Sequence, residues 1–532
     1  MPLFRSRFRR AAGRALALGF LLGGIPPSAF SAPPAPTSVA PASVTARQAQ
    51  TKETWMGLYM GPQKIGYTRI RVEPTTYKNR PALRTTSEGV TKLSLLGTTV
   101  EQREAQETLS DLNYQPLSQT FDITSSGSGL RLEATYDYAA RKVFCRLRTG
   151  ESGSTKTLTI PRGANLAGDT NLLTEGKKLS VGQKLSFYYL NPVSVALEEA
   201  KVEIAGREAV KDPRTGKTVS AFVVKARLAL GEATSWETED GDTIKGEMGF
   251  GGIRITMRLE PKEVALNLNA PASGSEENGG KAYVPPADFM IATAIATDKP
   301  IENPRRVSGL TVLVSGVPDK QFVFSDDRQK AEILPTANAA DTTVRFEVTA
   351  KPFDATKSVE MPVTKADFLP YLQKAAYLDT DDPAIQKTAL ALRGQEKNLY
   401  RIACRLRDWV HKNMTPDPSI GVPRSASDIF GRRRGVCRDY ATLYATLARA
   451  AGVPTRLCSG IVYADGRFFY HAWAESYVGE WVAFDPTLHD PAQPQDYVDA
   501  THIKFAQGDV TSMFNVVAVI GRLRITVQKV AS

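Results

Sequence analysis

Cys437 has the sequence context of a reactive thiol. It ends the run Gly435-Val436-Cys437, where the glycine allows a tight backbone turn and the cysteine begins a helical pattern. Unpaired backbone N–H groups and the positive end of the helix dipole favour an anion at such a position. Because the thiolate is the nucleophilic form of cysteine, we expect nucleophilic chemistry there. Taken alone, the residue also fits the usual role of a free cysteine, a small buried hydrophobe.

A histidine and an aspartate follow at a spacing that a β-hairpin can bring together. His471 lies in an alternating run 34 residues after Cys437 (471 − 437), and Asp485 follows 14 residues later (485 − 471). A two-residue turn would place Asp485 on the face opposite to His471. A three-residue loop at 478–480 instead pairs Tyr477 with Trp481 and puts both side chains on one face. We therefore predict such a loop or a bulge, with Asp485 orienting the imidazole and His471 taking the thiol proton.

Four short motifs in this region carry a resemblance to a known family. They are Gly-x-Cys at a helix start, Gly-Val-Pro-x-Arg leading into a strand, His-Ala-Trp in a strand, and Trp-x-x-x-Asp-Pro-Thr, in that order within residues 425–487. Over about residues 380–505 the chain resembles the transglutaminase-like superfamily of cysteine enzymes. The resemblance implies a papain-like α+β core and acyl transfer through a thioester. It also implies that Cys437 is the nucleophile, His471 the base and acid, and Asp485 the orienting group.

Three neighbouring residues are candidates for substrate binding. Trp473 and Trp481 flank the predicted site and could form the walls of a cleft, although packing of the sheet on a helix is the alternative interpretation. Arg438 follows the nucleophile and adds positive charge beside it. Cys404 and Cys458 either pair or remain core thiols. No role is predicted for His489 or His502.

A metal site is not predicted. The chain has four histidines and four cysteines, and it contains neither a CxxC nor an HExxH pattern. The resemblance brings in calcium, which animal transglutaminases need, but the chain has no acidic loop of the EF-hand type. We expect no cofactor.

Two helices and a small sheet are expected to position these residues. Apolar side chains recur at helical spacing from Leu399 to Val410, in a helix ending near Met414. A second helix begins at Cys437 and is stopped by Gly452 and Pro454. Strands are expected at 458–463, 468–478 and 481–485. These elements predict a transglutaminase-like α+β domain over residues 369–532.

The rest of the chain is predicted to be β-rich. Alternating runs separated by turn clusters fill residues 55–268, as one large β domain or two smaller ones. A Gly/Ser/Pro-rich linker follows at 269–286, and a small β-sandwich-like domain at 287–368. The predicted fold class is therefore multidomain, with a large β-rich N-terminal region, a small sandwich and a papain-like α+β core.

Composition and the first residues indicate compartment and partners. Of the net charge of +11 over 532 residues, five positive charges lie in the first 14 residues, so the remainder gives no argument for nucleic-acid binding. Residues 1–32 show the three-part pattern of a secretory signal, and residues 33–54 read as a Pro/Ala/Ser linker. We expect an exported protein, periplasmic or extracellular, with no transmembrane span in the mature chain.

Two functions remain open on these grounds. The first is an exported cysteine enzyme, a peptidase, amidase or transglutaminase, that cleaves or transfers an amide or isopeptide bond of a protein or peptide substrate. Cell-envelope components are among the plausible substrates. The second is a non-catalytic envelope binding or scaffold protein with a transglutaminase-like fold.

Overall fold

The computed structural model describes residues 51–532 apart from seven gaps: 96–97, 169–178, 229–230, 251–252, 269–292, 336–341 and 492–496. The predicted signal at 1–32 and the predicted linker at 269–286 lie outside the described residues, as does most of the linker at 33–54. Regular structure begins at Lys52, three residues before the predicted start (55 − 52). It does so because Lys52 and Thr54 already pair with Val72 and Ile70 of the next strand.

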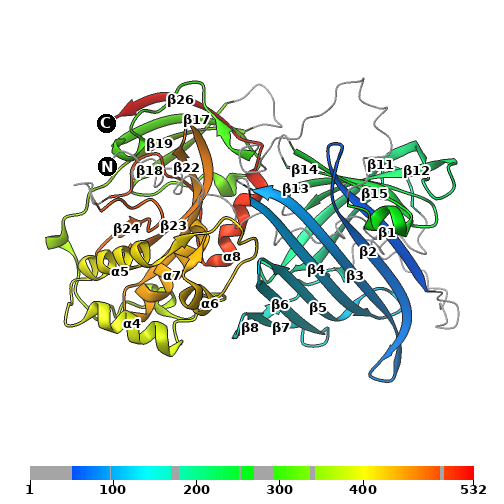
Figure 1. Cartoon of the computed structure of the whole chain (residues 1–532), viewed down its shortest axis with the longest axis horizontal. Helices are drawn as coiled ribbons and strands as arrows, with labels where there is room; N and C mark the ends of the chain where they lie inside the picture. Colours follow the sequence, from blue (N-terminus) through cyan, green and yellow to red (C-terminus); the bar gives the residue numbers. More distant parts are fainter. Residues whose placement is uncertain are drawn as a thin grey trace. The chain divides into compact units, whose positions relative to one another are not determined.

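The chain divides into two compact units. One contains most of the chain up to Phe289, and the other is made mainly of Met290–Ser532. Figure 1 labels the elements of both units along the sequence colours, and each unit is described here by itself.

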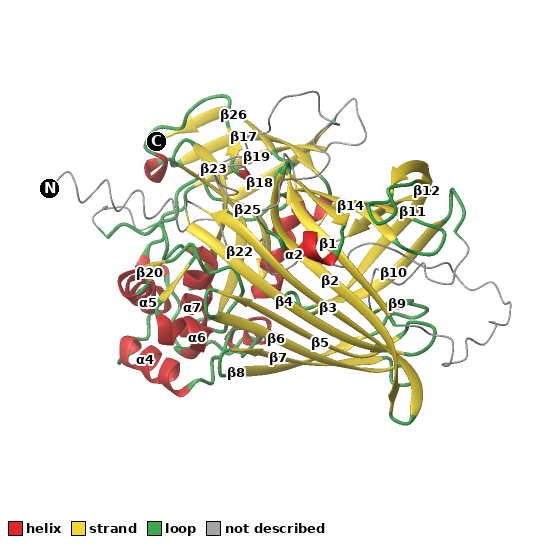
Figure 2. Cartoon of the chain, turned by 45° about the vertical axis from the view of Figure 1, so that its right-hand side comes forward, coloured by secondary structure: helices red, strands yellow, loops and turns green. Residues whose placement is uncertain are grey.

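The N-terminal unit is built on a single sheet of 15 strands. The strand order is β8-β7-β6-β5-β4-β3-β2-β1-β15-β14-β13-β12-β11-β10-β9, so that the first strand pairs with the last long one. Figure 2 shows the long strands β2 to β6 side by side. The strands are β1 (Lys52–Met60), β2 (Gln63–Tyr77), β3 (Arg80–Leu95), β4 (Thr98–Ser110), β5 (Pro116–Ser125), β6 (Ser128–Asp137), β7 (Lys142–Thr149), β8 (Ser152–Thr159), β9 (Leu166–Ala167), β10 (Lys184–Asn191), β11 (Ala196–Lys211), β12 (Thr218–Leu228), β13 (Gly231–Glu237), β14 (Thr243–Phe250) and β15 (Ile253–Leu259).

The alternation of apolar and polar residues explains this sheet. In β7, Val143, Cys145 and Leu147 are buried while the residues between them are exposed, as expected for a strand with one covered face. The prediction of a β-rich region is confirmed. The described part of this unit contains one short helix, α2 (Lys262–Leu266).

The C-terminal unit has a central mixed layer of strands and helices. Its main sheet has the order β16-β23-β22-β25, and β24 pairs with the other end of β23. The strands are β16 (Ile295–Ala296), β22 (Thr455–Ala464), β23 (Arg467–Tyr477), β24 (Trp481–Phe484) and β25 (Ile503–Gly508), and the helices are α4 (Pro383–Arg393), α5 (Leu399–Asn413), α6 (Ala426–Arg432), α7 (Cys437–Ala450) and α8 (Val510–Met513).

Helix α7 is the core of this unit. All but one of its residues are buried, and it packs on β23, β22 and the helices α4 and α5. The hydroxyl of Tyr444 hydrogen-bonds Ser476 of β23 at 2.8 Å, and its ring stacks on Phe484 of β24. The two helices and three strands predicted around the site are therefore present.

A second sheet of four strands has an unexpected member. Its order is β18-β19-β17-β26, with β17 (Gly309–Val317), β18 (Gln329–Leu334), β19 (Thr342–Thr349) and β26 (Arg524–Ala531). The sequence predicted a self-contained sandwich within 287–368, but β26 comes from the far end of the chain and pairs antiparallel with β17. A further small pair is β20 (Thr415–Pro416) with β21 (Arg434–Gly435).

Candidate active site

Cys437 is the first residue of α7, as the sequence predicts. The turn before it is held by Asp439, whose Oδ2 accepts a hydrogen bond from the backbone N–H of Val436 at 3.1 Å. Two arginines that are each 1% exposed neutralise that buried carboxylate: Arg424 at 3.0 Å and Arg438 at 3.2 Å. The start of the helix is thus fixed by a buried network of charges.

Gly435 serves this turn for a reason other than the one predicted. Its φ is not among the positive values of the chain. A Cβ atom there would instead lie 2.4 Å from Oδ2 of Asp439 and 2.8 Å from Nη2 of Arg424. The glycine provides space for the charge network rather than an unusual backbone conformation.

The β23–β24 hairpin has the predicted register. Tyr477 pairs with Trp481, and the pairing continues to Ala474 with Phe484. The connecting loop has three residues, closed by a hydrogen bond from Val478 N to Glu480 O at 2.9 Å. Gly479 adopts a φ of +126°, a conformation that other residues rarely adopt. This loop length sets the face from which Asp485 projects.

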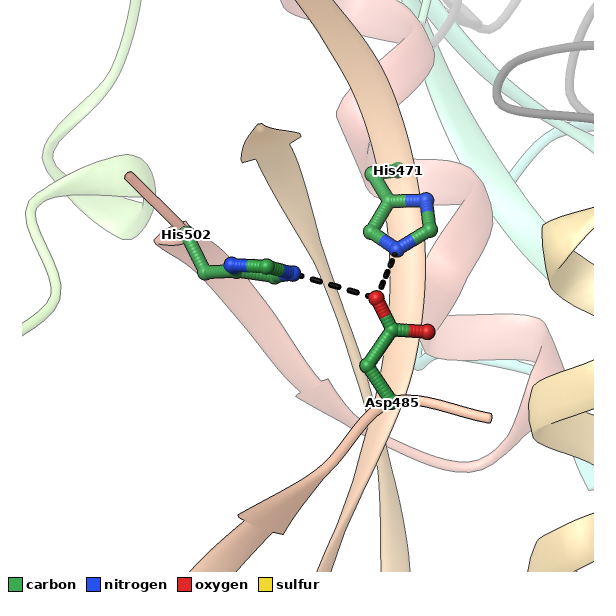
Figure 3. Close-up of side chains that lie close together, drawn as sticks. All are labelled: His471, Asp485 and His502. Atoms are coloured by element: carbon green, nitrogen blue, oxygen red, sulfur yellow. Dashed lines mark hydrogen bonds and ion pairs between the residues drawn. The ribbon is translucent and has the colours of Figure 1, made fainter. Parts of the chain in front are cut away.

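His471 and Asp485 meet as a consequence. Nε2 of His471 lies 2.8 Å from Oδ2 of Asp485, as Figure 3 shows. The other carboxylate oxygen, Oδ1, accepts the backbone N–H groups of Thr487 at 2.8 Å and Leu488 at 3.3 Å. The turn after β24 therefore holds the carboxylate with one oxygen directed at the ring.

Burial and charge act in opposite directions on this pair. Burial alone would lower the pKa of His471, but the charge and hydrogen bond of Asp485, with a smaller effect of Cys437, raise it. Burial likewise would raise the pKa of Asp485, but His471 and then His502 hold it well below its ordinary value. The net effect favours an imidazolium beside a carboxylate.

The thiol interacts with the same imidazole. A side-chain hydrogen bond with Cys437 is one of the effects that raise the pKa of His471. Since Nε2 is bonded to Asp485, Nδ1 is the nitrogen left for the thiol proton. Cys437 and His471 are fully buried and Asp485 is 5% exposed, so a substrate can reach the sulfur only after local opening.

His502 is a member of this site that sequence reasoning missed. Its Nε2 lies 3.1 Å from Oδ2 of Asp485, and its ring centroid lies 5.6 Å from that of His471. The available signal was weak: His502 immediately precedes the strand that begins at Ile503. Register arithmetic on one hairpin could not connect it to Asp485.

The same three side chains are the one group of the described residues able to offer three metal-ligand atoms. One atom each of His471, Asp485 and His502 lies within 4.8 Å of the others. Two imidazoles and a carboxylate suit zinc or a related ion. Both rings, however, reach the same carboxylate oxygen, an arrangement that hydrogen bonds satisfy without an ion.

The structure corrects two of the substrate-binding candidates. Trp473 is fully buried, where it packs with Cys458 and Ala483, so it does not line a cleft. Arg438 is also buried and donates to Val422 O and Asp439. Both side chains serve packing, because the helix start and the sheet are covered on the sides from which these residues project.

Trp481 lies away from the proposed reacting groups. It is at the far end of β24, four residues from Asp485, which is about 13 Å along a strand. There it stacks edge-on against Tyr477 and Tyr371, and the guanidinium of Arg456 lies 3.9 Å from its ring centre. This aromatic cluster gives Trp481 a packing role, and it is only partly exposed.

The cysteines and one hollow complete the surroundings. All four cysteines are free, so Cys404 and Cys458 do not pair. A hollow reaches the side of Asp485 and His502 that faces away from Cys437's helix start, and Arg305, Arg407 and His489 contribute to its lining. His489 binds Asp408 at 3.1 Å rather than Asp485.

Comparison with known proteins assigns the region that holds these residues. Residues 386–486 match the sequence model of the transglutaminase-like superfamily. The C-terminal region is transglutaminase-like. The matched segment contains Cys437, His471 and Asp485.

One curated relative is an uncharacterized protein of Mycobacterium leprae, 28% identical over 165 residues. That alignment covers 26% of this chain, which spans just over half, 57%, of the relative's length.

Solved structures share parts of the fold. A candidate cysteine protease of Cytophaga hutchinsonii matches at a TM-score of 0.29 and 21% identity, over 42% of this chain and 85% of that one. A β-barrel-like protein of unknown function from Brucella abortus matches at 0.30 and 14% identity, over 39% and 95%. A candidate protease of Parabacteroides distasonis matches at 0.18 and 11% identity, over 69% and 63%.

Among the described residues, no helix is both long and apolar enough to cross a bilayer.

Proposed function

We propose that the C-terminal unit is a cysteine acyl-transfer enzyme in which Cys437 is the nucleophile. The observation that supports this most directly is the 2.8 Å contact between His471 and Asp485, with the thiol at the start of α7 bonded to the same ring. Nucleophile, base and orienting carboxylate are the three parts that such chemistry requires.

The proposed steps follow from these positions. Nδ1 of His471 takes the thiol proton, and the thiolate attacks an amide carbonyl. The C–N bond breaks, the amine leaves with the proton from His471, and a thioester remains on Cys437. Water or an amine then attacks the thioester, which gives hydrolysis or transamidation. We favour hydrolysis of a protein or peptide amide in the cell envelope or outside the cell, where the Arg-rich signal-like start would direct the chain.

A non-catalytic scaffold is the second candidate. The observation that favours it is the complete burial of Cys437 and His471. A buried thiol that never becomes accessible would be a packing residue.

Alkylation kinetics separate the two candidates without knowledge of the substrate. Iodoacetamide at neutral pH should label Cys437 much faster than Cys145 and Cys458, because burial raises the pKa of Cys145 to about 11 and that of Cys458 well above its ordinary value. Peptide mass spectrometry gives each rate, and Cys437→Ala confirms the assignment. Equally slow labelling of all three thiols would support the scaffold.

Substrate capture then tests the chemistry. Envelope extracts incubated with the wild type should leave an acyl group on Cys437 that identifies the substrate. His471→Ala, with the thiol intact, should trap none. Acyl-transfer or hydrolytic activity that survives both Cys437→Ala and His471→Ala would contradict the proposal.

A further inference from the structure

Asp485 is shared between two histidines. Its Oδ2 lies 2.8 Å from Nε2 of His471 and 3.1 Å from Nε2 of His502 (Figure 3). An ionised carboxylate can only accept hydrogen bonds, so each of these nitrogens must carry its hydrogen. The tautomer of both rings is therefore fixed by one oxygen atom, and the hydrogen that His502 contributes does not depend on the state of its Nδ1.

The turn before β25 holds His502 in this place. Asp499 accepts hydrogen bonds from Thr501 through Oδ1, at 2.9 Å from the backbone N–H and 2.5 Å from the hydroxyl. Its Oδ2 lies 2.8 Å from Arg305 and 3.4 Å from Nδ1 of His502. Trp473 packs edge-on against the His502 ring at a centroid distance of 5.4 Å.

We propose that His502 is a positioning residue for the Cys437 site, which holds the Asp485 carboxylate in the orientation that His471 needs. This inference rests on the function proposed above and extends it by a fourth side chain. His502 acts through Asp485 and does not touch the reacting atoms.

The four hydrogen bonds of Asp485 explain why a second histidine is needed. Two backbone N–H groups occupy Oδ1 and two imidazoles occupy Oδ2, which fills the roughly four acceptor positions of a carboxylate. Without His502 one position on Oδ2 is open toward the hollow that Asp485 and His502 line. Water there would compete with His471 for the same oxygen, and the carboxylate would be free to rotate.

A pair of variants of similar size tests this role. His502→Gln keeps an N–H donor within reach of Asp485, whereas His502→Leu removes it. We expect His502→Leu to slow iodoacetamide labelling of Cys437 roughly 10- to 100-fold below pH 7, the usual effect of losing a hydrogen bond to a charged group. The loss should shrink above pH 9, where an ordinary thiol ionises without help. His502→Gln should stay close to the wild type at every pH.

The control is the other histidine beside the hollow. His489→Leu removes a ring that binds Asp408 and not Asp485, so it should leave the labelling profile of Cys437 unchanged. Cys458 reports unfolding, because a disrupted core would speed its labelling too. If His502→Leu does not fold, His502→Asn replaces it, since the shorter amide cannot reach Asp485.

The outcomes distinguish this inference from the proposed function. Equal pH profiles for the glutamine and leucine variants would overturn the role of His502 while fast labelling in the wild type would still support the enzyme. Slow labelling of Cys437 in the wild type would remove the enzyme and this inference together. A transition metal that copurifies in one equivalent and is lost in His502→Leu would show that the three groups are metal ligands, and would also overturn the inference.

Discussion

Asp485 reaches His471 because the β23–β24 loop has three residues. With Tyr477 paired to Trp481, Asp485 falls on the face of β24 that corresponds to Trp473 and His471 on β23, and the two side chains meet at 2.8 Å. The contact depends on a loop length, not on sequence proximity.

Shortening this loop should therefore destroy the site. Deletion of Gly479 leaves a two-residue turn and moves Asp485 to the opposite face. We expect Cys437 to lose its fast alkylation, with a rate that falls to that of Cys458. Gly479→Ala is the matched control, because it keeps the register and costs about 1–2 kcal/mol for the strained φ. Fast alkylation of Cys437 in the deletion variant would contradict the register argument.

Removing the charge of Asp485 should lower the pKa of His471. Burial already acts in that direction, and the charge and hydrogen bond of Asp485 are what raise the value above 6.5. In Asp485→Asn the imidazole should therefore titrate at lower pH. With four histidines in the chain, NMR of 13C-labelled histidine can follow each ring. An unchanged midpoint for His471 would mean that the carboxylate does not control the ring.

The same substitution should change acid stability. The pKa of Asp485 is held well below 3.8, since the attraction of His471 outweighs burial. A carboxyl of lowered pKa contributes stability above its unfolded value of 3.8, and that contribution is lost as the pH falls through its folded value. The stability advantage of the wild type over Asp485→Asn should be full near pH 6 and shrink below pH 4. Urea unfolding at three pH values measures it, and an advantage that grows on acidification would refute the assignment.

The charge network at the start of α7 should be a major source of stability. Asp439→Ala leaves the guanidinium groups of Arg424 and Arg438, both almost fully buried, without their shared carboxylate. Loss of one partner of a buried pair costs about 3–5 kcal/mol. Glu332→Ala, which breaks the exposed pair with Arg345, should cost no more than about 1 kcal/mol. Urea unfolding of both variants gives the comparison, and equal effects would show that the network is dispensable.

Gly460 should control the position of His502. It lies opposite His471 on β22 and beside β25, and a Cβ atom there would come within 1.9 Å of Ile503 O. Gly460→Ala should push β25 outward and produce the labelling profile of His502→Leu without any change to a polar side chain. Gly206→Ala, where a Cβ meets nothing within 4 Å, is the control. A wild-type profile in Gly460→Ala would show that β25 adapts without moving His502.

Local patterns predicted the elements and the hairpin well. Helical spacing placed α5 and α7, and alternation with a loop count placed Asp485 beside His471. These inferences use residues that lie close together in the chain, where periodicity is informative.

Contacts between distant segments were out of reach. Glu475 was open to a substrate or solvent role by sequence, but it is buried between Arg456 at 2.7 Å and Lys504 at 2.6 Å. Lys504 and His502 both arrive on β25, whose pairing with β22 contains an irregularity at Gly460. No period in a single strand encodes such a meeting.

Pairing of β26 with β17 also constrains the order of assembly. The two strands lie more than 200 residues apart, so the sheet that begins at Gly309 stays open until Arg524–Ala531 has been synthesised. Loops of this length close slowly. A nascent chain would therefore carry all the groups of the site well before its scaffold is complete, and ribosome stalling or proteolysis near the C-terminus would leave an apolar strand edge open to aggregation.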